Sequence, residues 1–158
     1  MNVDPDTFRA VLGRFATGVT ILTARDATGG DHGMTVSAFS SVSLQPPLVL
    51  ACVDRTATMH DLLMSQDRVG ISILASSQEA LSRRFAELES DRFEGLGYMR
   101  GESGVVLFED ALAHLECRVR DRHAAGDHTV FVCEVERAET QQDRPLLYYR
   151  GGYAQLER

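Results

Sequence analysis

Residues 111–138 read ALAHLECRVRDRHAAGDHTVFVCEVERA, with apolar and polar residues alternating through the first half. This period of two is typical of a β-strand with one covered face. The stretch predicts two long strands, Ala111–Arg122 and His128–Ala138, joined by a turn over residues 123–127. The first strand has an apolar face of Ala113, Leu115, Cys117 and Val119, and a polar face of His114, Glu116, Arg118 and Arg120.

Further strands are expected on the N-terminal side of this stretch. Residues 19–24 are rich in β-branched side chains and are followed by turn-forming residues at 28–31, a pattern typical of a hairpin. The second strand of the hairpin is expected over residues 33–39, and a polar loop over Ser40–Pro47. Residues 48–53 are apolar at every position, which predicts a central strand covered on both faces.

The remaining strands complete a mainly β fold. Val69, Ile71 and Ile73 alternate as in a strand, and residues 146–153 predict a further strand pair. With roughly eight strands, no βαβ rhythm and no internal repeat, the sequence predicts an antiparallel barrel of the Greek-key type, closed or split. We expect a single domain over residues 1–158.

Short helices are expected around these strands. Asp4 followed by Pro5 is a helix start signal, and the apolar residues after it share one helical face. A later helix carries two arginines: Arg84 lies between its buried apolar positions, and Arg83 points nearly opposite and is expected to face solvent. The apolar positions are Phe8, Val11, Leu12 and Phe15 in the first helix, and Leu81, Phe85 and Leu88 in the second.

Composition excludes several classes of protein. The net charge of -7 and the pI near 5.2 argue against nucleic acid as a partner. All 16 basic residues are arginines, so there is no lysine for a Schiff base or a Walker loop. No apolar run approaches the roughly 20 residues of a membrane-spanning helix, and the first residues lack the features of a signal peptide. We therefore expect a soluble cytoplasmic protein without a membrane partner.

The motifs of several enzyme classes are also missing. The five histidines and three cysteines form no metal-binding spacing, so no metal site is expected, and the cysteines are interpreted as buried reduced thiols. There is no G-x-S-x-G motif for serine hydrolysis. There is also no G-x-G-x-x-G motif after a strand, so a nicotinamide dinucleotide would have to act on another bound cofactor. Flavin chemistry suits such a chain because the cofactor carries the hydride transfer.

Seven segments together resemble the flavin reductase family, whose members have an FMN-binding split barrel. The resemblance covers nearly the whole chain and implies a homodimer that reduces diffusible FMN or FAD with NADH or NADPH, often for a separate flavin-dependent monooxygenase. The segments are FATGVT (15–20), GMTVSAFSSVSLQPP (33–47), CVDR (52–55), LSRRFA (81–86), LEC (115–117), GDHT (126–129) and LLYYRG (146–151).

The resemblance also implies the cofactor-binding residues. A serine-rich segment would meet the flavin through backbone and hydroxyl groups, and the end of the strand at residues 48–53 would run beside it. Two threonines match hydroxyl positions near the flavin phosphate, although Thr58 could equally be only a helix N-cap. The implied residues are Thr35, Val36, Ser37 and Ser41 in the first segment, Cys52, Val53 and Asp54 in the second, and Thr56 and Thr58 near the phosphate.

Four more site residues follow from the same resemblance. Arg84 and Phe85 match the arginine-phenylalanine pair of the family, although Arg84 could instead form a structural ion pair. His128 matches the family histidine near the nicotinamide, and otherwise it would be an ordinary exposed loop residue. Tyr153 is a weaker candidate for the same pocket. The chain departs from the family pattern at Gln45, where an acidic residue is common, and at Tyr98, where related chains often have tryptophan.

The main hypothesis is therefore an NAD(P)H:flavin oxidoreductase, in which the nicotinamide stacks on the flavin and hydride passes to flavin N5. One alternative is a non-catalytic module that binds flavin or a tetrapyrrole on the same barrel. Another is an oxidase with FMN as a prosthetic group, of the kind found in pyridoxamine-phosphate-oxidase-like barrels. The sequence does not choose between FMN and FAD or between NADH and NADPH.

Overall fold

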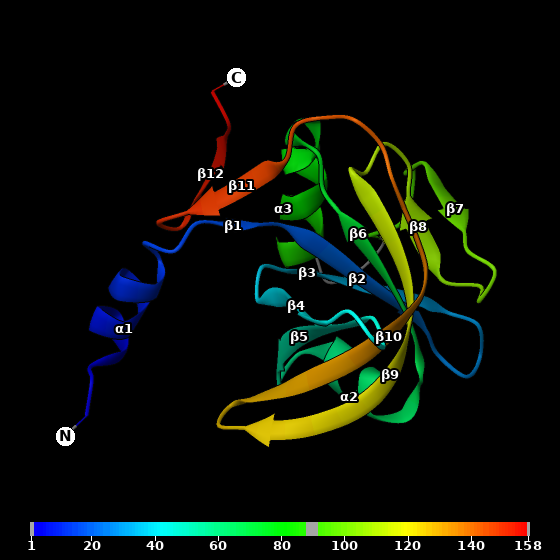
Figure 1. Cartoon of the computed structure of the whole chain (residues 1–158), viewed down its shortest axis with the longest axis horizontal. Coiled ribbons are helices and arrows are strands. Elements are labelled where there is room, and N and C mark those ends of the chain that lie inside the picture. Colours follow the sequence, from blue (N-terminus) through cyan, green and yellow to red (C-terminus); the bar gives the residue numbers. More distant parts are fainter. Residues whose placement is uncertain (1, 88–91, 158) are drawn as a thin grey trace.

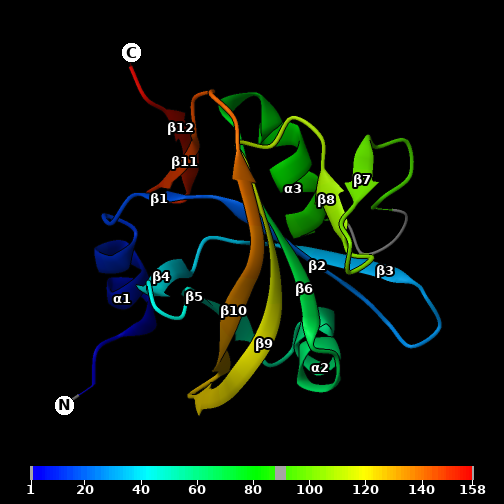
Figure 2. The same ribbon diagram turned by 45° about the vertical axis from the view of Figure 1, so that its right-hand side comes forward.

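The computed structural model describes residues 2–87 and 92–157. It contains the hairpin that the alternating sequence predicts, and both strands of this hairpin extend beyond the predicted C-terminal ends. The hairpin consists of β9 (Ala113–Ala125) and β10 (His128–Thr140) and runs along the body of the molecule (Figure 2). His128 pairs with Ala125, so only Gly126 and Asp127 form the turn, and the predicted five-residue turn is wrong. Gly126 has φ +64, as a tight hairpin turn requires.

The structure is mainly β, with twelve strands in the described residues rather than eight (Figure 1). The largest sheet has the order β3 (Asp31–Val36), β2 (Thr20–Arg25), β6 (Arg68–Ile73), β9, β10, β5 (Leu48–Asp54) and β4 (Phe39–Ser43), all antiparallel. The smaller sheets are β1 (Thr17–Gly18), β11 (Leu146–Tyr149) and β12 (Gly152–Gln155), and β7 (Tyr98–Arg100) with β8 (Val106–Phe108). The helices are α1 (Pro5–Leu12), α2 (Thr58–Ser65), the 3-10 turn η1 (Ser76–Gln78) and α3 (Glu79–Glu87).

The large sheet is not closed by hydrogen bonds. The consecutive strands β3 and β4 occupy its two edges, and no ladder joins them within the described residues. The sheet nevertheless surrounds one apolar core, to which β2, β3, β5, β6, β9, β10 and α2 all contribute buried side chains. The coarse prediction of an antiparallel, mainly β fold with a few short helices is confirmed.

Two local predictions around β5 are wrong. β5 is not a central strand covered on both faces: it lies next to the edge strand β4, and only alternate residues, Val49, Ala51 and Val53, are buried. The segment after Phe39 is not a loop throughout, because residues 39–43 pair with β5 as strand β4. A sequence that is apolar at every position can thus form a strand whose second face, with Leu48, Leu50 and Cys52, is only half-buried.

The polar face of β9 is not exposed along its whole length, because His114 is half-buried and Glu116 is buried. Arg118 and Arg120 are exposed as predicted, whereas Glu116 is buried. The segment between β7 and β8 folds over this carboxylate, and both the amide and the hydroxyl of Ser103 donate hydrogen bonds to Glu116 Oε1, at 3.0 and 2.8 Å. A buried carboxylate with such donors is a satisfied acceptor.

The N-terminal helix forms as predicted but buries none of its side chains. The Asp4 carboxylate accepts a hydrogen bond from the Asp6 amide (2.9 Å), which confirms the N-cap. Figure 1 shows α1 lying apart from the large sheet. Its apolar face is therefore uncovered, with exposures of 56% for Phe8, 61% for Val11, 50% for Leu12 and, just after the helix, 74% for Phe15.

α3 packs its apolar side against a second core. Phe85 is fully buried and contacts the rings of Phe93 and Phe108, with centroids 5.0 and 5.1 Å away. Arg83 is exposed, as predicted, and Leu88 lies outside the described residues. Among the described helices, none has the length and apolar character that crossing a membrane would require.

Candidate functional site

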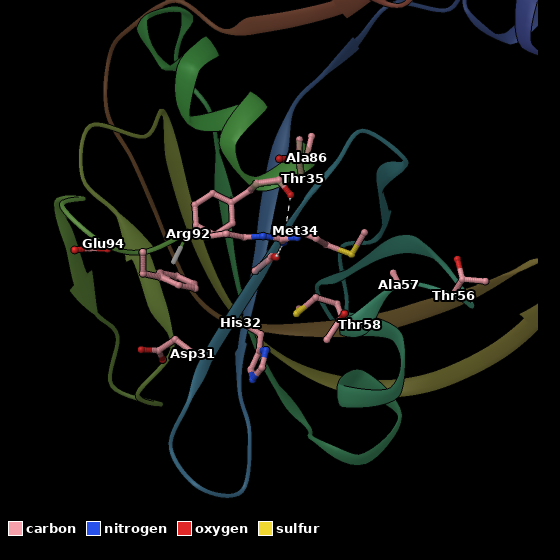
Figure 3. A pocket seen from close by; sticks show the side chains of 14 residues that line it. Asp31, His32, Met34, Thr35, Thr56, Ala57, Thr58, Ala86, Arg92 and Glu94 are labelled. Atoms are coloured by element: carbon pink, nitrogen blue, oxygen red, sulfur yellow. Dashed lines mark hydrogen bonds between the residues drawn. The ribbon is translucent and has the colours of Figure 1, made fainter. Parts of the chain in front are cut away.

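A trough of about 960 Å³ crosses β3 between α2 and α3 (Figure 3). Its volume lies within the roughly 300–1,000 Å³ of typical small-molecule sites. Three segments far apart in the sequence form it: the β3 strand, the start of α2, and the end of α3 with the chain that follows residue 91. The lining residues are 31–35, 56–59, 85–86 and 92–94.

One wall of the trough is apolar and rigid. Phe85 reaches it from α3, and Met34 and Met59 approach from β3 and α2. Gly33 lets Phe85 lie directly against β3, because a Cβ at residue 33 would come within 2.9 Å of the Phe85 ring. Phe85 itself is only 1% exposed, so the apolar side chains that a flat ligand can contact are the partly exposed Met34 and Phe93.

Thr35 is tied to α3. Its hydroxyl donates to the Ser82 carbonyl (2.7 Å), and the Ser82 hydroxyl shares a hydrogen bond with the Tyr153 hydroxyl (2.6 Å). The Arg83 guanidinium lies over the Tyr153 ring, 4.8 Å from its centroid. Tyr153 thus supports α3 from the side of β12 and does not line the trough, whereas Thr35 does.

The start of α2 presents free helix-terminal donors to the trough. Ala57 occupies the N-cap and gives no side-chain hydrogen bond, so the alternative interpretation of Thr58 as N-cap is wrong: Thr58 is the first helical residue. The His60 amide already donates to the Ala57 carbonyl (3.0 Å), which leaves the amides of Thr58 and Met59 as the helix-terminal donors that favour anions. Both Thr56 and Thr58 line the trough beside them.

Asp54 holds this loop in place. Its Oδ1 accepts hydrogen bonds from the Thr56 amide (2.8 Å) and the Thr56 hydroxyl (2.7 Å). These two bonds lower the pKa of Asp54 from its ordinary value, so the carboxylate stays charged at neutral pH. Asp54 therefore fixes Thr56 at the mouth of the trough rather than lining it.

Several predicted residues lie in strands next to the trough. Val36 and Val53 are buried in the main core, and Cys52 is half-buried, which raises the pKa of its thiol. Ser37 follows β3, and Ser41 is exposed in β4. None of these five lines the trough.

The predicted arginine and histidine lie at its margins. Arg84 Nη2 donates to the carbonyl of Glu94 (2.5 Å), a lining residue, and so fastens the rim to α3. His128 Nδ1 donates to Asp127 Oδ1 (2.7 Å). His128 lies opposite Asp54 in the pairing of β10 with β5. The Arg55 amide donates to the Asp127 carbonyl (2.9 Å), and this bond connects the β9–β10 turn to the loop before α2.

Sequence reasoning missed four lining residues with ionisable side chains, Asp31, His32, Arg92 and Glu94. His32 Nε2 donates to Asp26 Oδ2 (2.8 Å), and this bond, together with those from Thr28 and Gly30, holds the pKa of Asp26 well below its usual range. His32 and Met34 are two residues apart in β3, so their side chains lie on the same face of the strand, and this alternation could have indicated that His32 lines the trough. No local pattern indicates Arg92, which reaches the site only through the tertiary fold.

The cysteines and histidines show no metal-binding arrangement. Among residues 2–87 and 92–157 there is no group of three or more His, Cys, Asp or Glu side chains that could hold a metal ion. Cys117 and Cys133 are buried free thiols, and burial raises both pKa values, that of Cys133 to about 12. Such thiols are not reactive at neutral pH.

Comparison with known proteins gives a consistent family match. The family model described as "Flavin reductase like domain" matches residues 12–157. The chain is 39% identical over 150 residues to a "Probable flavin reductase" of Rhizobium meliloti, covering 95% of this chain but 48% of that protein. The chain thus spans about half the length of this relative.

Two further matches cover most of both chains. The reductase subunit HsaB of a flavin-dependent monooxygenase from Mycobacterium tuberculosis is 36% identical over 162 residues, which is 99% of this chain and 84% of the relative. The solved structure of the Streptomyces globisporus NADH:FAD oxidoreductase SgcE6, in complex with NAD and FAD fragments, is 37% identical. It superposes with a TM-score of 0.92 over 99% of this chain and 96% of that chain.

Proposed function

This chain belongs to the family of flavin reductase like domains, and from that premise we propose that it reduces FMN or FAD with NADH or NADPH. The flavin, when bound, supplies the redox chemistry by accepting a hydride at N5 from the nicotinamide. The protein then has to bind both molecules, orient them face to face and exclude water.

One observation carries the proposal: the trough joins an aromatic wall to a helix start without a side-chain cap. A flavin nucleotide has the matching parts, a flat apolar ring system and an anionic phosphate. The partly exposed Met34 and Phe93 suit the ring, and the start of α2 with the hydroxyls of Thr56 and Thr58 suits the phosphate. The residues present therefore fit the cofactor.

The roles of the other family positions rest on the resemblance to the family. We assign Thr35, Val36, Ser37 and Ser41 to the polar edge of the flavin, and Cys52, Val53 and Asp54 to the strand beside it. Arg84 contributes at the rim through its bond to the Glu94 carbonyl, and Tyr153 acts through Ser82. β3 and β4 are the two edge strands of the large sheet and do not pair with each other. This strand order supports the interpretation of residues 1–158 as one FMN-binding split-barrel domain.

His128 is assigned to the nicotinamide. It stands beside the loop that carries Thr56, and Asp127 orients its ring by accepting from Nδ1. This bond leaves Nε2 as the ring nitrogen that can meet a ligand. The assignment makes His128 a binding and orienting group, and no protein nucleophile is required.

Two partners are part of the proposal. The uncovered apolar face of α1, with Phe15 at its end, supports a homodimer in which a second copy of the chain covers it. The similarity to a monooxygenase reductase subunit supports a flavin-dependent monooxygenase as the acceptor of reduced flavin.

Nicotinamide consumption tests the proposal. Purified protein is mixed with NADH or NADPH and with FMN or FAD, and the nicotinamide absorbance is followed. We expect consumption well above the rate without protein, and a rate that depends on added flavin. A protein that stays yellow through dialysis but consumes no nicotinamide would indicate a flavin-binding module instead. Turnover without flavin exchange would indicate an oxidase with prosthetic FMN.

A further inference from the structure

The imidazole ring of His32 is held in the trough by a carboxylate whose other oxygen already forms a complete turn. Asp26 Oδ1 accepts hydrogen bonds from the Thr28 amide (2.9 Å), the Thr28 hydroxyl (2.7 Å) and the Gly30 amide (2.8 Å), which close the turn between β2 and β3. Asp26 Oδ2 accepts a separate bond from His32 Nε2 (2.8 Å). The turn does not need this last bond, whose effect is to orient the ring.

The orientation leaves Nδ1 as the second nitrogen of the ring. Asp26 stays ionised at neutral pH because its pKa lies well below the usual range, so it only accepts and His32 Nε2 donates. Within residues 2–87 and 92–157, no protein group forms a hydrogen bond with His32 Nδ1. The side chain is half-buried and lines the trough, so this nitrogen is left for a ligand.

His32 lies at the end of the trough where α2 begins. α2 packs against β3, the strand that carries His32. Figure 3 shows His32 and Thr58 on one side of Met34, and Thr35 and Ala86 on the other side. An anionic group bound by the free amides at the start of α2 would therefore meet the imidazole from the side of β3.

The other ionisable groups near this end already have partners or point elsewhere. Arg100 donates to both oxygens of Asp31, at 2.9 and 2.7 Å. On α2, the His60 ring is buried and bonded to the Thr129 hydroxyl (2.7 Å), and Asp61 is exposed. The remaining charged lining residues belong to the segment after residue 91 and are Arg92 and Glu94. His32 is therefore the ionisable group that β3 offers to a ligand opposite α2.

We propose that His32 binds the phosphate of the flavin, and that Asp26 is the positioning residue that orients it. The proposal rests on the proposed function and adds a contact from β3 to the phosphate site at the start of α2. A phosphate oxygen accepts from Nδ1 only when that nitrogen carries a proton, so binding of the phosphate takes up a proton from solvent at His32. The imidazolium then donates to two anions, one at each ring nitrogen.

Calorimetric titration of the full chain with FMN, and with riboflavin as the flavin without a phosphate, tests the proposal. At about pH 7.5 the phosphate of free FMN is almost fully ionised, because the second pKa of a phosphate monoester is about 6. Titrations in two buffers that differ in ionisation enthalpy then measure the protons that the protein takes up. We expect uptake of a fraction of a proton per FMN and none with riboflavin.

His32→Gln separates binding from structure. Its amide reaches the position of Nε2 and keeps a donor for Asp26, but it has no group at the position of Nδ1. The variant should lower the preference for FMN over riboflavin about tenfold, the size of one charge-assisted hydrogen bond, and should abolish the proton uptake. Asp26→Asn should lower the preference by a smaller factor. His123→Gln, at an exposed histidine of β9 outside the trough, should behave as wild type.

Two results would overturn the proposal. Wild-type protein could take up no proton when it binds FMN, or His32→Gln could weaken FMN and riboflavin by the same factor. If His32→Gln melts at a lower temperature than wild type, the proton uptake of wild type decides alone. An unchanged preference in Asp26→Asn would withdraw the positioning role of Asp26. Binding of neither FMN nor riboflavin to wild-type protein would instead refute the proposed function itself.

Discussion

Gly33 and Phe85 are in direct contact, and the contact leaves no room for a side chain on Gly33. A Cβ at residue 33 would lie 2.9 Å from Phe85 Cε1 and 3.0 Å from Cδ1. β3 and α3 can therefore approach closely only at a glycine. The position of the aromatic wall of the trough depends on this contact.

Gly33→Ala should displace Phe85 and weaken both the fold and flavin binding. Overpacking of this kind costs about 1–3 kcal/mol in the free energy of unfolding. The matched control is Gly18→Ala, where an added Cβ meets no atom within 4 Å. Denaturant unfolding and flavin titration of both variants check the prediction. An unchanged flavin affinity in a destabilised Gly33→Ala would remove Phe85 from the site.

Thr129→Val should destabilise the attachment of α2 to the sheet. His60 of α2 is buried and its Nε2 shares a hydrogen bond with the Thr129 hydroxyl (2.7 Å). Removing the hydroxyl leaves a buried ring nitrogen unsatisfied, at a cost of about 1–3 kcal/mol. Thr129→Ser keeps the hydroxyl and should lose less stability. Chemical denaturation compares the two, and equal losses would contradict the role of the hydrogen bond.

Asp26 should make stability depend on pH in the acid range. Hydrogen bonds from His32, Thr28 and Gly30 lower its pKa in the folded state below the ordinary value of 3.8. The folded state therefore binds a proton at Asp26 more weakly than the unfolded state does. The charged carboxylate of Asp26 stabilises the fold fully above the pKa of the unfolded chain, and this contribution is lost as pH falls from there through the lower pKa of the folded state. The difference in melting temperature between wild type and Asp26→Asn should be largest near neutral pH and shrink below about pH 4.

Asp121→Asn is the control for that series, because Asp121 is an exposed aspartate on β9. Its melting temperature should follow wild type across the whole range. A gap between wild type and Asp26→Asn that stays constant down to pH 2 would contradict the assigned hydrogen bonds.

His128→Ala should weaken nicotinamide binding and leave flavin binding unchanged. Loss of a hydrogen bond to a ligand costs about 1–1.5 kcal/mol, so the KM for NADH should rise about tenfold. His123→Ala removes a nearby exposed histidine of β9 and should have no effect. Steady-state kinetics and flavin titration separate the two substrates. Normal kinetics for His128→Ala would withdraw its role.

Local patterns were sufficient where one segment determines its own structure. The alternation in residues 111–138 predicted the β9–β10 hairpin, and Asp4 with Pro5 predicted the start of α1. The errors come from neighbours that the pattern does not reveal. Glu116 is buried because a distant segment folds over it, and β5 is half-covered because β4 pairs beside it at the edge of the sheet.

The site was predicted only in part, because some of its residues are brought together by tertiary contacts that a local sequence pattern does not reveal. Thr35, Thr56, Thr58 and Phe85 line the trough. Thr35 and Phe85 belong to segments that resemble the family, and Thr56 and Thr58 follow such a segment closely. Arg92 could not be predicted, because its place beside Gly33 depends on the path of the chain after α3. Tyr153 was predicted as a lining residue, but in the structure it shares a hydrogen bond with Ser82 of the helix that carries Phe85 and does not line the trough.

Anaerobic mixing of the protein with NADH and FAD is the most direct test of the central claim, that this chain transfers reducing equivalents from nicotinamide to flavin. The absorbance of oxidised flavin and of NADH is followed together. The account predicts that both decrease in equal amounts, at a rate that rises with protein concentration. Loss of neither absorbance beyond the rate without protein, with FAD or FMN and with NADH or NADPH, would contradict it.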